Sequence, residues 1–389
     1  MHIIPRSLEK ELLTMTQHFQ VVGVIGQRQV GKTTLVKSIM NKLPKNVVYL
    51  DLERPSDRLK LDDAELFLSQ QKEKTVIIDE VQHKRDLFPL LRALVDQTNE
   101  PGQFIILGSA SPDLIRDSSE SLAGRIAYLK LTPFSIPEIS KHLSQSQLWM
   151  RGGFPLAALA SSDEVWAQWT DNFIRTYLER DLPMLGLRVE PPTLERFWRI
   201  LAHLSSHILN MAELAKSLGL TSPPIKRYLD FMENAFLIKR LYSFSWNIKK
   251  RLVKSPKVYL TDTGLMHRLL NITDFDDLSG HPSIGNSWET FAVNQILSVN
   301  ADRLTPYFYR TQHQAEIDLV LTKGFYPKAA IEIKYSNAPA LSKGNYQAID
   351  DIGAPINFVI TPSSDDYLFK EHIRICSLEA FMQKYLGEI

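Results

Sequence analysis

The segment that most constrains this chain is a phosphate-binding loop pattern near its N-terminus. Residues 26–34 match G-x-x-x-x-G-K-[ST] at every fixed position. The pattern follows an apolar run, 21–25, typical of a strand, and precedes a helical stretch, 35–43. Such a loop binds phosphates because its backbone N–H groups and the following helix N-terminus face the negative charge. This context favours a parallel α/β sheet that binds a nucleoside triphosphate over a glycine-rich turn that matches by chance.

The residues of this loop have separate expected roles. Lys32 is expected to reach the β- and γ-phosphates, the Thr33 hydroxyl to ligate Mg²⁺, and Thr34 to continue the helix. The predicted nucleotide-binding residues are Gly26, Gln27, Arg28, Gln29, Val30, Gly31, Lys32, Thr33 and Thr34.

A carboxylate pair, Asp79-Glu80, follows a second apolar run at 76–78. Three consecutive β-branched residues in that run favour a strand buried on both faces of a parallel sheet. Ligands of such sheets bind at the carboxyl ends of the strands. We expect Asp79 to hold Mg²⁺ through water and Glu80 to polarise the attacking water. The alternative is an ordinary helix start, where Asp and Glu are common, but the phosphate loop favours the catalytic interpretation.

Two further polar residues are candidates for the same site. Ser109 follows the apolar run 104–107, and we expect it to sense the γ-phosphate from the end of a third strand. Arg125 follows Gly124 on a predicted loop, from which an arginine can enter a neighbouring subunit's site and offset transition-state charge. An ion pair with a nearby carboxylate accounts for Arg125 equally well.

Together these motifs resemble those of one bacterial and archaeal family of AAA+ ATPases. The resemblance rests on the phosphate loop, on Asp79-Glu80 and on the segments 108–109, 122–125, 133–134 and 152–155. Members of that family carry a winged helix and a C-terminal domain of restriction-endonuclease-like fold, and their function is unknown. The resemblance covers nearly the whole chain. It implies an AAA+ core, Arg125 as an arginine finger, and a homo-oligomer, with a hexameric ring favoured.

Composition indicates a multi-domain protein. Its 389 residues suffice for two or three domains with their own cores. With 44% hydrophobic and 23% charged residues, the chain is neither disordered nor membranous. No apolar run approaches the roughly 18 residues of a membrane span, and no signal-peptide pattern precedes the first strand. The single cysteine, Cys376, excludes an intramolecular disulfide, and no Cys/His cluster has zinc spacing. We therefore expect a cytoplasmic protein without membrane contact.

Turn signals and composition shifts divide the chain into four expected domains. The predicted α/β fold comprises an AAA+ P-loop core at 1–150, a helical connector at 151–190, a winged helix-turn-helix at 191–265 and a restriction-endonuclease-like domain at 280–389. Aromatic residues between 166 and 177 recur at spacings of three and four. This stripe predicts a packing face of the connector rather than a base-stacking platform.

A helix-turn-helix is predicted between residues 210 and 236. Asn210 is a favourable cap for its first helix, and Gly219 is a favourable end. The segment from Ile225 to Lys257 contains nine basic and two acidic residues. Its net charge is therefore +7, whereas the net charge of the whole chain is +1. This local charge favours DNA contact. The candidate DNA-binding residues are Lys226, Arg227, Lys249, Lys250 and Arg251. The alternative is a winged helix used only for protein packing.

The C-terminal region contains a second candidate site. Segments 315–321 and 330–335 alternate polar and apolar residues, which predicts two strands with their charges on one face. Asp318, Glu332 and Lys334 can therefore converge, and they match the D…(D/E)-x-K pattern of restriction-endonuclease-like phosphodiesterases. Asp318 and Glu332, with a share from Glu289, would bind one or two Mg²⁺ ions that activate water. Lys334 would orient that water or neutralise developing charge. An internal ion-pair cluster on an inherited scaffold is the alternative.

The sequence thus predicts an enzyme that uses ATP and Mg²⁺ and couples ATP binding and hydrolysis to binding or remodelling of DNA. Branched DNA is one candidate form, and a Mg²⁺-dependent nuclease is a candidate second activity. The competing hypothesis is a non-nucleolytic, ATP-dependent switch. In that hypothesis the winged helix and the C-terminal domain serve assembly or protein partners.

Overall fold

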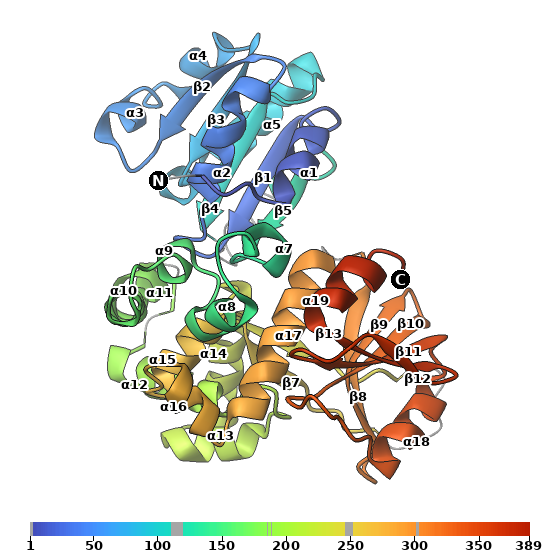
Figure 1. Cartoon of the computed structure of the whole chain (residues 1–389). Coiled ribbons are helices and arrows are strands. Elements are labelled where there is room, and N and C mark those ends of the chain that lie inside the picture. Colours follow the sequence, from blue (N-terminus) through green and yellow to red (C-terminus); the bar gives the residue numbers. More distant parts are fainter. Residues whose placement is uncertain (1–2, 110–119, 185, 188, 246–251, 301–302) are drawn as a thin grey trace. The chain divides into compact units, whose positions relative to one another are not determined.

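The computed structural model describes residues 3–109, 120–184, 186–187, 189–245, 252–300 and 303–389 (Figure 1). The chain forms two compact units. The first comprises Met1–Phe134 and the short segment Asn234–Phe236, and the second comprises Ser135–Glu233 and Leu237–Ile389. Within the described ranges, no helix is long and apolar enough to cross a membrane.

The first unit is built on a five-stranded parallel sheet with the strand order β2-β3-β4-β1-β5. Strand β4 therefore lies between β1, which leads into the phosphate loop, and β3, which ends at Asp79. The strands are β1 Val21–Gly26, β2 Asn46–Asp51, β3 Lys74–Asp79, β4 Phe104–Ser109 and β5 Ile126–Leu131. The α-helices are α1 Leu8–Met15, α2 Lys32–Ile39, α3 Pro55–Leu59, α4 Ala64–Ser69 and α5 Leu87–Thr98, with 3₁₀ turns at Met40–Lys42 and Val81–Lys84.

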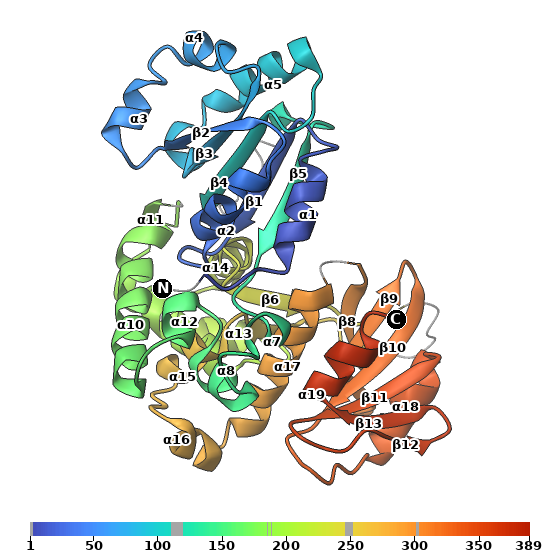
Figure 2. The same ribbon diagram turned by 45° about the horizontal axis from the view of Figure 1, so that its top comes forward.

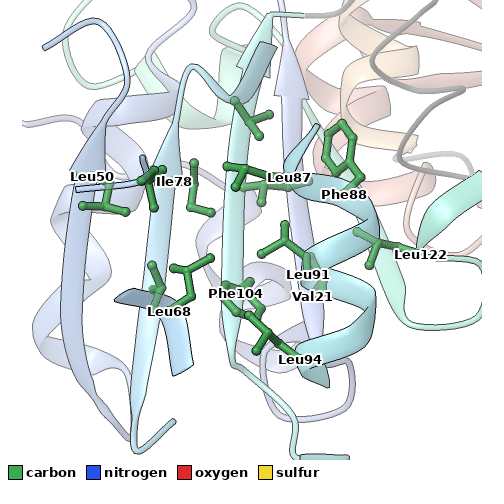
Figure 3. Packing of buried hydrophobic residues seen from close by; sticks show 14 of the residues in the cluster. Val21, Leu50, Leu68, Ile78, Leu87, Phe88, Leu91, Leu94, Phe104 and Leu122 are labelled. Carbon is green, nitrogen blue, oxygen red and sulfur yellow. The ribbon is translucent and has the colours of Figure 1, made fainter. Parts of the chain in front are cut away.

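Helices cover both faces of this sheet. On one face, Leu12 of α1 and Val36 of α2 pack with Val22 of β1. On the other face, Leu91 of α5 and Ile78 of β3 belong to one buried cluster, part of which Figure 3 shows. Burial on both faces explains why the strands are continuous apolar runs, as the sequence predicts for a parallel sheet.

The second unit begins with a series of helices. They are α7 Ile136–Ile139, α8 Gln145–Arg151, α9 Pro155–Ala158, α10 Asp163–Thr176, a π-helical turn Tyr177–Asp181, α11 Leu182–Met184, α12 Pro191–His203, α13 Met211–Leu218, α14 Ser222–Asn234, α15 Thr263–Leu269 and α16 Phe275–Gly280. Trp166, Phe173 and Tyr177 are buried on α10 and the turn that follows it. The aromatic stripe is therefore a packing face, as predicted.

Helices α13 and α14, joined by a short turn, lie where the sequence predicts the two helices of a helix-turn-helix. The side chain of Asn210 accepts hydrogen bonds from the backbone N–H groups of Ala212 at 3.1 Å and Glu213 at 3.3 Å, and Gly219 ends α13 with a φ of 66°. The buried residues of α14 are Ile225, Tyr228, Leu229 and Met232. Both the caps and the inward face of α14 agree with the sequence prediction.

The C-terminal part of this unit is a mixed six-stranded sheet with the order β12-β13-β11-β10-β9-β8. Strands β8, β9 and β10 are antiparallel neighbours, whereas β10, β11 and β13 run parallel, with α18 connecting β10 to β11. The elements are α17 Ile284–Asn300, β8 Thr305–Arg310, β9 Glu316–Lys323, β10 Tyr326–Ile333, α18 Lys343–Ile352, β11 Ile356–Thr361, β12 Tyr367–Lys370, β13 Ile373–Ser377, α19 Leu378–Ala380 and a π-helical turn Phe381–Tyr385.

A two-stranded antiparallel ribbon, β6 Ile238–Leu241 and β7 Lys257–Leu260, follows the helix-turn-helix. Backbone hydrogen bonds join the segment after β6 to the edge strand β8 (Figure 2). Phe244 N–H donates to the Phe308 carbonyl at 2.7 Å, and Phe308 N–H donates to the Tyr242 carbonyl at 3.0 Å. The ribbon is thus anchored to the C-terminal sheet.

Candidate nucleotide site and carboxylate cluster

The phosphate loop connects β1 to α2 at the carboxyl end of the first sheet. Gly31 immediately precedes α2 with a φ of 100°, a left-handed conformation that residues with a Cβ rarely adopt. The helix then starts at Lys32, so its free N–H groups lie at the loop. This is the arrangement that the spacing of the motif predicts for a phosphate site.

Lys32 is buried, and it holds the loop through backbone carbonyls. Its Nζ donates to the carbonyl oxygens of Gly26 at 3.1 Å and Gln27 at 2.9 Å. Burial lowers the pKa of Lys32 to about 8, although the charges of Glu80 and Asp79 oppose this shift. Both acceptors are neutral carbonyl oxygens, so an anionic phosphate can replace them as the partner of the ammonium group.

Asp79 connects the end of β3 to the phosphate loop. Its Oδ2 accepts hydrogen bonds from the hydroxyl groups of Thr33 at 2.7 Å and Tyr49 at 2.5 Å. The Asp79 side chain is buried at 3% exposure. The structure therefore brings together the two predicted Mg²⁺ ligands, Thr33 and Asp79. Tyr49 is an additional residue that the sequence did not indicate.

Glu80 follows β3 in an unusual backbone conformation. Its φ is 56°, in the left-handed region, and its N–H donates to Asp79 Oδ1 at 2.9 Å. The Glu80 carboxylate accepts a hydrogen bond from the side chain of Gln82. Residues kept in this strained region cluster at functional sites, so the conformation agrees with a functional role for Glu80.

The remaining loop residues differ in exposure. Gln27 and Val30 are buried, Arg28 is half-buried, and Gln29 and Thr34 are exposed. Arg28 lies 3.8 Å from Glu53 in an ion pair.

Arg6, which sequence reasoning missed, supports the loop from the N-terminal segment. It donates to the Val30 carbonyl at 3.0 Å and to the Thr132 carbonyl at 2.5 Å. Because Arg6 lies outside any motif, no local pattern marks it.

Ser109 and Arg125 occupy opposite ends of the sheet. Ser109 ends β4 and pairs in register with Gly26, so its backbone lies beside the start of the phosphate loop. Arg125 precedes β5, whose first residue pairs with Val21 at the start of β1. A six-residue strand spans about 20 Å. Arg125 therefore does not reach the phosphate loop of its own chain. Its guanidinium pairs instead with Asp96 on α5.

The predicted basic surface is smaller than the sequence count indicates. Lys226 and Arg227 are exposed on α14, as predicted, and Lys249, Lys250 and Arg251 lie outside the described residues. Two other basic residues of the segment are paired with carboxylates. Arg240 forms ion pairs with Asp230 and Glu233. Lys257 is only 3% exposed. Lys257 contributes to the +7 of the segment, but its burial removes it from any basic surface that could contact DNA.

Four acidic residues, Glu289, Glu316, Asp318 and Glu332, form a group that we call the carboxylate cluster, in which Asp318 and Glu332 are buried and the other two are partly buried. Pairing of Ile331 with Leu319 places Glu332 opposite Asp318 on adjacent antiparallel strands. Asp318 Oδ2 accepts a hydrogen bond from the N–H of Ile333 at 3.0 Å, and Glu332 pairs with the Lys334 ammonium at 2.6 Å. The predicted convergence of Asp318, Glu332 and Lys334 is therefore present, with Glu289 contributed by α17.

The side chain of Lys257, from β7, lies inside this cluster. Its Nζ is 2.9 Å from Asp318 Oδ1, 2.9 Å from Glu316 Oε1 and 3.1 Å from Glu289 Oε1. Tyr259, two residues further along β7, donates its hydroxyl to the same Glu289 oxygen at 2.7 Å. No pattern in the sequence marks Lys257 as internal, because a four-residue strand is too short to show a period.

The protonation of the cluster reflects this packing. Burial alone lowers the pKa of Lys257, but Asp318, Glu289 and Glu316 outweigh burial and raise it well above its ordinary value. Burial and the Asp318 charge raise the pKa of Glu289 and of Glu332 above the ordinary glutamate range. Lys257 is thus charged at neutral pH, and some of the acidic charge is suppressed.

The carboxylate cluster, as arranged, does not fit a divalent ion. Mg²⁺ binds oxygen at roughly 2.1 Å, and the Asp318 and Glu289 oxygens that would bind it already contact the Lys257 ammonium. A second cation at that position would be repelled at close range. Among the described residues, no group of three or more His, Cys, Asp or Glu is placed to hold a metal ion. One feature favours a ligand nonetheless, since Glu332 Oε2 is buried without a hydrogen-bond partner.

The segment Gly152-Gly153 has a structural role in the second unit. Gly152 has a φ of +76°, and a Cβ there would lie 2.2 Å from Asp262 Oδ1. Asp262 accepts hydrogen bonds from the N–H groups of Gly153 at 2.7 Å and Leu265 at 2.9 Å, and so caps α15. Burial raises the pKa of this carboxyl to about 6.

Comparison with known proteins finds a family model that matches most of the first unit and relatives that match most of the chain. Residues 18–140 match a family model described as an AAA domain. Residues 114–276 and 284–381 each match a domain of unknown function. An uncharacterized protein of Mycobacterium tuberculosis is 41% identical over 332 residues, which cover 85% of this chain and 74% of the relative. The chain belongs to the family of this mycobacterial protein.

Further relatives and solved structures match at equal or lower identity. An uncharacterized protein of Mycobacterium bovis matches with the same identity and coverage. An uncharacterized protein of Haemophilus influenzae is 25% identical over 62% of this chain and 67% of its own length. A Walker-type ATPase of Pyrococcus abyssi is 14% identical with a TM-score of 0.47, covering 69% of this chain and 96% of that one. Thermotoga maritima RuvB is 17% identical with a TM-score of 0.31, and the match covers 61% of this chain and 90% of the RuvB chain. The AAA domain makes the first unit a P-loop ATPase fold, as the motifs predict.

Proposed function

We propose that the family member described here binds and hydrolyses ATP at the phosphate loop of its AAA domain. The 2.7 Å hydrogen bond between Thr33 and Asp79 carries this proposal, because it brings together the two side chains that would hold Mg²⁺, Thr33 directly and Asp79 through water. These residues fit Mg²⁺, which would neutralise phosphate charge when bound with ATP. Lys32 would exchange its carbonyl partners for the β- and γ-phosphates, and Glu80 would polarise the attacking water.

Two residues complete the proposed ATP site. Ser109 would sense the γ-phosphate from the end of β4. Arg125 would leave Asp96 and enter the site of a neighbouring copy, since about 20 Å of strand separates it from its own phosphate loop. This role requires a homo-oligomer, for which we favour a hexamer.

We further propose that ATP turnover controls DNA binding by the second unit. Helices α13 and α14 and the β6–β7 ribbon have the order of elements found in a winged helix, with Lys226 and Arg227 exposed on the second helix. Lys249, Lys250 and Arg251 would extend this surface, and branched DNA is a candidate ligand. We assign the core to 1–150, the connector to 151–190, the winged helix to 191–265 and a restriction-endonuclease-like domain to 280–389, in a cytoplasmic protein.

The second candidate function is a non-nucleolytic, ATP-dependent switch. Lys257 favours it, because this ammonium group contacts the carboxylates that a nuclease needs for Mg²⁺. In that case the C-terminal domain serves assembly or partner binding, and cleavage of DNA is absent.

Phosphate release from ATP by the purified full chain tests the proposal. The wild type should hydrolyse ATP with Mg²⁺, and Lys32→Ala should bind ATP weakly and release little phosphate. Lys10→Ala, which changes an exposed lysine on α1, is the matched control and should retain wild-type turnover. A wild type no faster than Lys32→Ala would refute ATP hydrolysis at this site.

A further inference from the structure

The carboxylate cluster already contains a cation that belongs to the chain itself. We propose that Lys257 is the resident cation of this cluster, and that it locks strand β7 to the C-terminal sheet and excludes a divalent ion. The proposal concerns a site separate from the ATP site and does not depend on ATP hydrolysis.

The position of the lysine is set by several independent contacts. The carboxylates within 3.1 Å of its Nζ come from α17 and from two positions of β9. The backbone of β7 is held as well, since Ser206 N–H donates to the Val258 carbonyl at 2.7 Å and Leu209 N–H donates to the Pro256 carbonyl at 2.9 Å. Lys257 therefore reaches the cluster from a fixed strand.

Strand β7 presents two polar side chains to the cluster from one face. Residues two apart on a strand point to the same side, and both Lys257 and Tyr259 contact Glu289 Oε1. A buried lysine is costly unless its charge is paired. Lys257 contacts three carboxylates, and Tyr259 on the same face of β7 donates a hydrogen bond to one of them. Two side chains of one strand thus bind the same cluster, which an incidental contact does not explain.

Each carboxylate of the cluster has a cationic partner from the chain itself. Glu332 pairs with Lys334, and Glu316 pairs with Arg310 at 2.9 Å in addition to Lys257. Asp318 and Glu289 rely on Lys257 as the cationic partner. Removing the lysine therefore leaves two carboxylates that a divalent ion can satisfy.

This junction has a consequence for the organisation of the second unit. Lys257 belongs to the ribbon that follows the helix-turn-helix, whereas its partners belong to the C-terminal sheet. The ribbon and the sheet should therefore move as one body, and metal-dependent chemistry at the cluster would require β7 to withdraw its lysine.

Calorimetric titration of the nucleotide-free full chain with Mn²⁺ tests the proposal. Wild type and Asp318→Asn should bind the same number of Mn²⁺ ions, because the cluster takes none. Lys257→Met should bind one further Mn²⁺, and Lys257→Met/Asp318→Asn should lose it. Lys254→Met changes an exposed lysine three residues earlier and should behave as wild type. Without Mn²⁺, Lys257→Met should melt at a lower temperature than Lys254→Met, and Mn²⁺ should raise that temperature by mass action.

Two results would overturn the proposal. The first is a wild-type Mn²⁺ site that disappears in Asp318→Asn, which would mean that a metal ion displaces or accompanies the lysine. The second is a folded Lys257→Met protein that melts at the wild-type temperature and gains no metal site. If Lys257→Met does not fold, as judged by circular dichroism, the comparison of wild type with Asp318→Asn still decides the outcome.

Discussion

Replacement of Glu80 by glutamine should slow ATP hydrolysis while leaving ATP binding and folding nearly unchanged. A positioned general base contributes about 10²–10⁴-fold to a rate, which is about 3–5 kcal/mol of activation free energy. Glutamine keeps the shape of the side chain but cannot accept a proton from the attacking water. We therefore expect Glu80→Gln to lower kcat by that factor.

The structure also predicts what this substitution leaves intact. The Glu80 N–H bond to Asp79 Oδ1 at 2.9 Å is a backbone contact and survives. The left-handed conformation at φ 56°, which costs about 1–3 kcal/mol, is present in both proteins. An amide oxygen can still accept the hydrogen bond from Gln82. Stability and ATP affinity should therefore match the wild type.

Steady-state phosphate release, nucleotide affinity and thermal melting are the required assays. Glu73→Gln is the matched control, since Glu73 is an exposed glutamate just before the opposite end of β3. It should turn over ATP at the wild-type rate. Turnover of Glu80→Gln within about twofold of wild type, with ATP bound normally, would refute Glu80 as the base.

Four other predictions follow from the same contacts. ATP affinity should fall as pH rises through about 8, where free Lys32 loses its proton; a flat titration between pH 7 and 9.5 would contradict this. Arg125→Ala should lose turnover but keep ATP affinity, and mixing it with Lys32→Ala should restore some activity; no rescue from a monomeric active protein would exclude action between subunits. Replacing Lys226 and Arg227 by alanine should weaken DNA binding and reduce its logarithmic salt slope by about 2, as measured by fluorescence anisotropy at several salt concentrations. Gly152→Ala should lower the free energy of unfolding by about 2–5 kcal/mol, because the new Cβ strains a left-handed residue and displaces the Asp262 cap; an unchanged urea midpoint would refute that explanation.

The arrangement of the candidate ATP site could be predicted from the sequence because its parts are local. Glycine spacing defines the phosphate loop, and an apolar run marks the strand that ends in Asp79. Tyr49 could not be predicted in the same way. It contacts Asp79 because β2 is the neighbour of β3 in the sheet, and strand order is a property of the tertiary fold. The ion pair of Arg125 with Asp96 joins a loop to α5. From the sequence, an ion pair was therefore only one of two alternatives for Arg125, the other being an arginine finger.

At the C-terminal site, too, the local features could be predicted from the sequence and the contact between distant segments could not. Alternation with period two placed Asp318 and Glu332 on one face, and antiparallel pairing brings them together. Lys257 is the last of the basic residues counted between 225 and 257, yet it is buried among carboxylates that lie at least 32 residues further along the chain. Charge counted along a sequence does not distinguish a solvated lysine from one that pairs inside the fold. This one contact favours the ion-pair alternative for the cluster over the metal site.

The most direct test of the central claim compares the DNA affinity of the full chain with ATP, with ADP and without nucleotide. Glu80→Gln protein would hold ATP during the measurement, and fluorescence anisotropy on linear, single-stranded and branched DNA at one salt concentration would give the dissociation constants. Coupling between two sites typically changes affinity by about 5–150-fold. We predict a change of that size between the ATP and ADP states on at least one form of DNA. Equal affinities in all three nucleotide conditions, for every form of DNA, would contradict an ATPase that controls DNA binding.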